Sequence, residues 1–121
     1  MKIFFDGSGW NGRESKYCVV FEDSRSPILK RFSEKKTNNE MEYAGLLEAL
    51  IQAKSGDAIF TDSQLIEGQV IKGWKVKAKH LQSLAKKAQS ALLEKNATLT
   101  WIPREKNKAG HALEGHAKRP Y

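Results

Sequence analysis

The sequence lacks several features that mark secreted and membrane proteins. Its single cysteine, Cys18, cannot form a disulfide within the chain, which fits the reducing cytoplasm. No apolar run approaches the length of a membrane span, and the N-terminus begins as a predicted strand rather than as a signal peptide. Internal repeats, linkers and low-complexity segments are also absent. We therefore expect residues 1–121 to form one cytoplasmic domain with no membrane association.

Acidic residues are outnumbered by basic ones. The chain carries 21 lysines and arginines against 14 aspartates and glutamates, which gives a formal net charge of +7. The corresponding isoelectric point is about 9.6. This excess favours a polyanionic partner, and nucleic acid is the first candidate. General solubility is the alternative explanation.

Apolar patterning and turn residues predict an α/β domain in which three strands precede alternating helices and strands. Thr37 and Glu40 form the pattern of a capping box, which marks the start of the long middle helix. The third strand carries interleaved charges and should lie at a sheet edge. The expected strands are 2–6, 16–22, 28–32, 58–61 and 97–102, and the expected helices are 37–54, 63–71, 78–96 and 108–118.

Two apolar runs each end on an aspartate. Residues 3–5 lead into Asp6, and residues 58–61 lead into Asp62. Continuous apolar runs are typical of strands buried on both faces, and ligands gather beyond the carboxyl ends of parallel strands. Two such strands would place the carboxylates side by side, which is costly unless a cation lies between them. The alternative is that each aspartate only caps a turn or helix.

A third carboxylate, Glu42, falls on the apolar side of the middle helix, which it shares with Leu46, Ala49 and Ala53. A carboxylate on such a face is costly without a partner. Glu40 already has the capping role and is the weaker candidate for chemistry. The alternative for Glu42 is an ordinary first-turn acid favoured by the helix dipole.

Four segments together resemble the type 1 ribonuclease H family, in order and over nearly the whole chain. They are Asp6-Gly7-Ser8-Gly9, Thr37-Asn38-Asn39-Glu40-Met41-Glu42, Thr61-Asp62-Ser63-Gln64 and Trp101-Ile102-Pro103-Arg104-Glu105-Lys106-Asn107. The resemblance implies a ribonuclease H-like α/β fold, with a five-stranded mixed sheet flanked by helices. It also implies an endonuclease that hydrolyses the RNA strand of RNA–DNA hybrids with two Mg²⁺ ions, or with Mn²⁺.

Roles for the three acids follow from this resemblance. Carboxylate oxygens suit Mg²⁺, and two metal ions about 4 Å apart can cut a phosphodiester. Asp6, on the expected central strand, is the candidate to bridge both ions. Glu42 and Asp62 would each hold one side.

The resemblance also implies substrate contacts. Asn39 and Gln64 follow the family's pattern for the minor groove of the hybrid, where amides can read a 2′-hydroxyl. Asn38, Gly7 and Ser8 would help to fit the RNA strand. The alternative for the two asparagines is helix capping.

The basic protrusion of many family members is reduced here to a short link. Trp74, with Lys75 and Lys77, is a candidate in this link to stack on DNA sugars and to touch phosphates. The alternative for Trp74 is packing between helices.

The sequence departs from the family pattern in its last helix. The family usually has an aspartate four residues after the loop asparagine, and here that position is His111. No aspartate follows Asp62 anywhere in the chain. Glu114, one helical turn further on, is the favoured fourth acid and metal ligand, with His111 as a proton-handling or phosphate-binding group. No role can be argued for His116.

Another nuclease of the same fold, such as a resolvase or transposase core, is disfavoured by the two asparagines and the Thr61-Asp62-Ser63-Gln64 segment. Two other functions remain open. The first is an active hybrid-specific endoribonuclease, which we expect to be monomeric and to need no protein partner. The second is a nucleic-acid-binding module of the same fold that is catalytically weak or inactive because the fourth acid is lost. The retention of Asp6, Glu42 and Asp62 favours the enzyme, since a binding module has no need of a costly acidic cluster.

Overall fold

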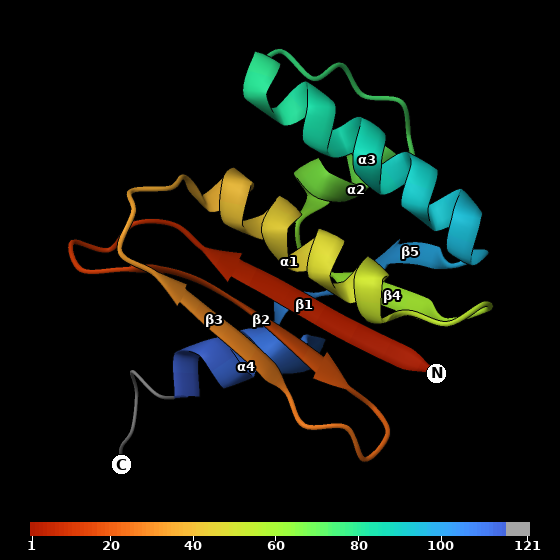
Figure 1. Ribbon diagram of the computed structural model, residues 1–121, viewed down its shortest axis with the longest axis horizontal. Coiled ribbons are helices and arrows are strands. Elements are labelled where there is room, and N and C mark those ends of the chain that lie inside the picture. The colour runs from red at the N-terminus through yellow and green to blue at the C-terminus, as the bar shows by residue number, and fades with distance from the viewer. Residues whose placement is uncertain (116–121) are drawn as a thin grey trace.

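The computed structural model describes residues 1–115, which form one five-stranded sheet with helices on both faces (Figure 1). The strands lie in the order β3-β2-β1-β4-β5. Their bounds are β1 Lys2–Ser8, β2 Ser15–Phe21, β3 Ile28–Phe32, β4 Ala58–Thr61 and β5 Thr98–Trp101. The helices are α1 Asn38–Gln52, α2 Gln64–Val70, α3 Lys79–Lys95, the short 3₁₀ helix η1 Arg104–Lys106, and α4 Lys108–Gly115.

Strand β1 is the centre of the sheet. It pairs antiparallel with β2 and parallel with β4, while β2–β3 is antiparallel and β4–β5 is parallel. The predicted mixed sheet is therefore confirmed, and so is the edge position of the charged third strand. The carboxyl ends of β1 and β4 lie at the same edge of the sheet because these strands run parallel.

The two faces of the sheet carry different cores. Ile3 and Phe5 belong to the larger core, which is closed by α1, α2 and α3. Phe4 faces the other way and packs with Cys18 and residues of α4. Side chains alternate along a strand, so a strand covered on both faces needs a continuous apolar run. Residues 3–5 provide that run, and Asp6 follows where it ends.

Helix α1 begins at the predicted capping box. The Thr37 hydroxyl accepts a hydrogen bond from the Glu40 amide at 3.1 Å, and the Glu40 carboxylate accepts one from the Thr37 amide at 2.8 Å. These two bonds satisfy amides that the helix itself leaves unpaired. The helix start is thus fixed beside the carboxyl end of β1.

The structure differs from the predicted boundaries most clearly at β1 and in the loop after β5. Strand β1 does not end at Asp6 but continues to Ser8, because Gly7 and Ser8 pair with β2 instead of forming a flexible turn. The loop after β5 contains η1. The last helix is described only to Gly115, so its expected end near residue 118 and His116 lie outside the described residues.

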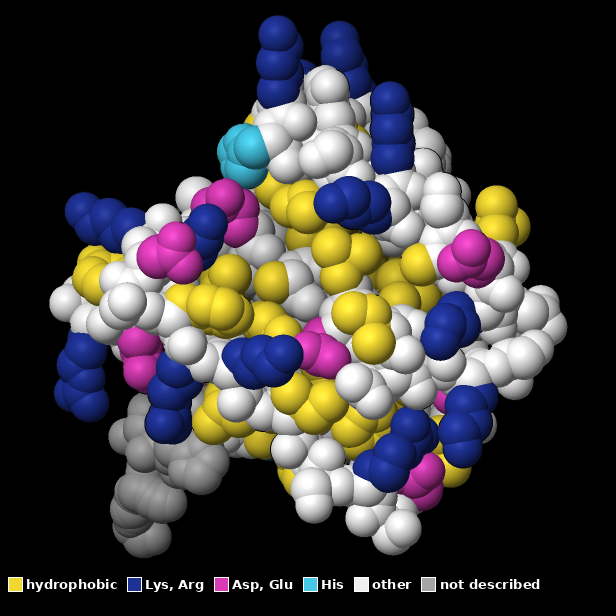
Figure 2. Space-filling view, viewed as in Figure 1, with side chains coloured by type: hydrophobic (Ala, Val, Ile, Leu, Met, Phe, Trp, Pro, Cys, Tyr) yellow, Lys and Arg dark blue, Asp and Glu magenta, His cyan; other side chains and the backbone are white. Residues whose placement is uncertain are grey.

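Exposed lysines cluster in the link between α2 and α3 and at the start of α3. Figure 2 shows basic side chains projecting from this end of the molecule. The exposed lysines here are Lys72, Lys75, Lys77 and Lys79.

None of the helices within residues 1–115 combines the length and the apolar content that a membrane span requires.

Candidate active site

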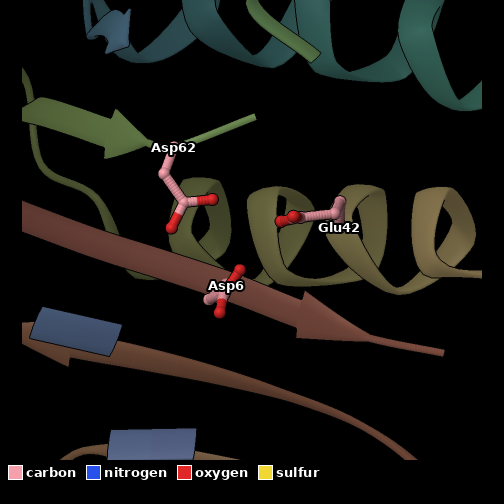
Figure 3. A group of neighbouring side chains, drawn as sticks. All are labelled: Asp6, Glu42 and Asp62. Carbon is pink, nitrogen blue, oxygen red and sulfur yellow. The ribbon is translucent and has the colours of Figure 1, made fainter. Parts of the chain in front are cut away.

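Three carboxylates from three separate elements meet at the carboxyl edge of the sheet (Figure 3). Asp6 lies on β1, Asp62 follows β4, and Glu42 comes from the early part of α1. One oxygen from each carboxylate lies within 4.8 Å of the others. Asp6 and Asp62 therefore lie side by side, as predicted, and Glu42 is the third member of the group.

Burial and mutual repulsion make this cluster unfavourable while it is charged. Burial, then the charges of Asp6 and Asp62, raise the pKa of Glu42 from 4.5 to about 9. Burial and the nearby Asp62 raise the pKa of Asp6 from 3.8 to about 6. Without a cation, burial and mutual repulsion therefore favour protonation within the cluster.

The cluster has the chemistry of a site for a hard cation. The Oε1 atom of Glu42 is buried and has no hydrogen-bond partner among the described residues. An unpaired buried acceptor is costly, and a cation bound between the carboxylates would remove that cost. A set of carboxylate oxygens is the donor set that Mg²⁺ and similar divalent ions prefer. The residues present thus fit a divalent metal.

Asn107 holds two parts of the site in place. Its buried Nδ2 donates hydrogen bonds to the Phe5 carbonyl at 2.9 Å and to the Asp62 Oδ2 at 3.0 Å. Its Oδ1 accepts a hydrogen bond from the Ala109 amide at 3.0 Å, at the start of α4. One side chain therefore ties β1, Asp62 and α4 together. The sequence predicted no structural role for Asn107, because no local pattern reveals a contact with a residue 102 positions away.

Two glycines allow the elements to approach each other closely. A Cβ on Gly7 would collide with the backbone of Met41 and Glu42, so the absence of a side chain lets α1 lie against β1. A Cβ on Gly110 would lie 3.2 Å from the Asp6 Oδ2. Gly110 is thus the point at which α4 comes directly beside the carboxylates.

The two candidates for the missing fourth acid are placed differently. Glu114 lines a cavity of about 370 Å³ that also contains Asp6 and Glu42. Its carboxylate lies 3.8 Å from the Arg104 guanidinium, and its side chain is 48 % exposed. His111 is exposed, and the described residues that line this cavity do not include it. Neither residue belongs to the cluster of three carboxylates.

Five of the residues predicted to contact substrate line one of two cavities. Gly7, Ser8 and Asn38 line the same cavity as Asp6 and Glu42. The Asn38 Oδ1 accepts a hydrogen bond from the Gly9 amide at 2.7 Å, which joins the start of α1 to the loop after β1. Asn39, the next residue of α1, is half-buried and does not line that cavity among the described residues.

A second, smaller cavity of about 230 Å³ contains the other two of these residues. Gln64 and Trp74 line it, together with Trp101, Glu67 and Lys72. The Trp74 ring packs against Gly68 of α2, and about half of the Trp74 surface remains exposed to solvent. Lys75, the next residue, is exposed and lines neither cavity within the described chain.

Comparison with known proteins identifies the family to which this chain belongs. The profile of the RNase H family matches residues 1–119. The chain belongs to the type 1 ribonuclease H family. Its curated relatives include the bifunctional protein Rv2228c of Mycobacterium tuberculosis, with 30% identity over 129 residues. The alignment covers 97% of this chain but 35% of that protein, so the chain spans about a third of its relative's length.

Solved structures of similar fold agree with this family. RNase H1 from the archaeon Halobacterium salinarum has 25% identity and a TM-score of 0.76, with 96% of each chain covered. LC11-RNase H1, isolated from compost, has 26% identity and a TM-score of 0.77, with 93% of this chain and 90% of that chain covered. LC11-RNase H1 has also been solved in complex with an RNA/DNA hybrid. The fold and family are thus those of ribonucleases H.

The raised pKa values predict how stability depends on pH in metal-free protein. A carboxyl whose pKa is higher in the folded state stabilises the fold at low pH, and this contribution is lost as pH rises toward the folded pKa. With EDTA present, stability should therefore fall between about pH 4.5 and about pH 9, the range set by Glu42. Glu42→Gln should be more stable than wild type at pH 8 by roughly 1–3 kcal/mol, because the amide removes the buried charge that Asp6 and Asp62 repel.

Urea unfolding at pH 5, 6.5 and 8 measures this difference directly. Glu94→Gln, which changes an exposed glutamate on α3, is the matched control and should follow wild type. Equal stability of Glu42→Gln and wild type across this range would show that the buried carboxyl carries no penalty.

Proposed function

We propose that this chain is an endoribonuclease that hydrolyses the RNA strand of RNA–DNA hybrids with divalent metal ions, Mg²⁺ or Mn²⁺. The observation that carries the proposal is the partly buried cluster of Asp6, Glu42 and Asp62 at the carboxyl edge of a ribonuclease H sheet. The net charge of +7 and the hybrid held by the LC11-RNase H1 relative support the substrate.

The cluster supplies the ligands for the metal ions. Asp6 lies on the central strand of the sheet and is the candidate to bridge two ions. Glu42 and Asp62 would each hold one side, and Glu114 lies at the same cavity as the candidate fourth ligand. Metal ions bound there would activate the attacking water and stabilise the departing 3′ oxygen.

Small and polar residues around the cluster would position the hybrid. Gly7, Ser8 and Asn38 line the cavity and would lie along the RNA strand. Asn39 and Gln64 would read 2′-hydroxyls through their amides, which both donate and accept hydrogen bonds.

The exposed link would reach the DNA strand. Trp74 is half exposed and offers a stacking surface, and Lys75 beside it offers a charge for phosphates. We further propose that residues 1–121 act as one cytoplasmic domain, as a monomer without a protein partner.

The second candidate is a ribonuclease H-fold module that binds nucleic acid but cleaves it weakly or not at all. The observation in its favour is His111, which stands where the family usually has an aspartate. The buried Glu42 argues against it, because a binding module would gain stability by losing this carboxylate.

Cleavage of labelled RNA–DNA hybrid tests the choice between these functions. Wild type with Mg²⁺ or Mn²⁺ should cut the RNA strand of the hybrid, and should leave duplex RNA, duplex DNA and all EDTA samples intact. Asp6→Asn should lose more than about a hundredfold in rate, the size of effect expected when a preorganised charge at the reacting centre is removed. Hybrid binding without cleavage by the wild type would instead favour the binding module.

The fourth acid is tested by comparing Glu114→Gln with His111→Ala in saturating Mg²⁺. Loss of an outer-shell partner of a metal usually costs about 10–100-fold, so a directly ligating Glu114 should cost about a hundredfold or more in kcat. His111→Ala should cost less than about tenfold, because a hard cation prefers anionic oxygen to imidazole.

The same comparison in Mn²⁺, which accepts nitrogen ligands better, checks this assignment. Glu94→Gln serves as the control for removing a negative charge elsewhere. An inactive His111→Ala beside a nearly normal Glu114→Gln would make His111 the ligand.

A further inference from the structure

Two basic side chains line the cavity that contains Asp6 and Glu42, and neither has a role in the function proposed above. Lys16 reaches it from β2, and Arg104 reaches it from η1 after β5. A cavity whose catalytic wall is anionic would be expected to repel a nucleic-acid strand. Cations on its other walls would offset that repulsion for the part of the strand that lies across the carboxylates.

Lys16 lies beside the end of β1, where it is the register partner of Ser8. Its side chain is only 14 % exposed. The nearest carboxylate is that of Glu14, with 3.9 Å between the Lys16 Nζ and the Glu14 Oε2. Glu14 is shared with Arg31, whose Nε lies 3.6 Å from the other carboxylate oxygen. Lys16 is thus a largely buried cation with a single long ion pair, which is an expensive arrangement without a further anion.

Arg104 approaches the carboxylates from the opposite part of the chain. Its Nη1 lies 3.8 Å from the Glu114 Oε2, and its side chain is 72 % exposed. It is close enough to the cluster for its charge to lower the pKa of Asp6, against the larger effects of burial and Asp62. The guanidinium can bind a phosphate through two parallel N–H groups, which a lysine cannot do.

The ion pairs that hold these two cations are weak. Exposed and partly exposed pairs at such distances contribute about 0–1 kcal/mol, and salt screens them. A phosphate carries a full negative charge and offers better geometry than either carboxylate. Exchange of Glu14 or Glu114 for a phosphate therefore costs little, and it would leave Glu114 free to turn toward the metal site.

We propose that Lys16 and Arg104 each bind a backbone phosphate of the RNA strand as it crosses the carboxylate cluster. The inference rests on the proposed function, since it takes the hybrid as substrate. It assigns these two residues to binding and positioning rather than to the bond-breaking step. The ligand class is the sugar–phosphate backbone, so the contacts read no base sequence.

The test is hybrid binding as a function of salt concentration, measured by fluorescence anisotropy in EDTA. An Asp6→Asn background prevents cleavage and reduces repulsion in the cavity. Adding Lys16→Gln or Arg104→Gln should weaken binding about tenfold and lower the salt slope by about 1, because each removes one phosphate contact. The double variant should lower the slope by about 2.

Matched variants separate a phosphate contact from loss of structure. Lys2→Gln removes a lysine at the other end of β1 that also has one long ion pair, 4.0 Å to Glu22, and it should leave the slope unchanged. Lys16→Arg and Arg104→Lys keep the charge and should restore most of the slope. Thermal unfolding of every variant in the same buffer excludes partial unfolding as the cause of weak binding.

A hybrid with single methylphosphonate linkages locates the contacts. A neutral linkage at the phosphate bound by Lys16 should weaken binding of the background protein, and should cause no further loss in Lys16→Gln. Unchanged salt slopes in Lys16→Gln and Arg104→Gln would overturn the inference. If wild type cleaves the hybrid but the variants show unchanged salt slopes, the proposed function stands and only this inference fails. If the variants show the expected salt slopes but wild type does not cleave, the proposed function fails and the phosphate contacts stand.

Discussion

Repulsion among three carboxylates within 4.8 Å of one another is the constraint on which the rest of this structure depends. In the folded chain, burial of Glu42 together with the charges of Asp6 and Asp62 raises its pKa to about 9. Folding has to supply the free energy that holds these groups together. A cation between the carboxylates would convert the repulsion into binding, so the cost of the cluster in the metal-free state is also the source of its affinity for metal.

Contacts made by uncharged residues hold the carboxylates in place. Asn107 connects the Phe5 carbonyl, Asp62 and the start of α4 through three hydrogen bonds. The absence of side chains at Gly7 and Gly110 lets α1 and α4 lie directly against the carboxylates. Because these contacts come from both faces of the sheet, a shift of either helix would alter the distances between the acids.

Much of this arrangement could be predicted from local patterns. The apolar runs that end on Asp6 and Asp62 placed both acids at one edge, and the capping box fixed the register that buries Glu42. Strand β1 was predicted too short, because the pairing of Gly7 and Ser8 with β2 depends on a partner strand and not on local preference.

Contacts between distant parts of the chain could not be predicted. The role of Asn107 needs Phe5, which is 102 residues away, and no local pattern reveals that contact. Lys16 and Arg104 come from separate elements, and only the folded chain shows that they share a cavity. Helical spacing put His111 and Glu114 within one turn of each other, whereas the structure places Glu114 at the cavity and leaves His111 outside its lining.

The most direct test of the central claim is a crystal structure of the wild-type chain soaked with Mn²⁺, with anomalous scattering used to locate the metal. The account predicts anomalous density between the carboxylates of Asp6, Glu42 and Asp62, with metal–oxygen distances of about 2.0–2.2 Å, near those of a small hard cation. Density only at other surface acids, or a cluster that stays free of metal at saturating Mn²⁺, would contradict it.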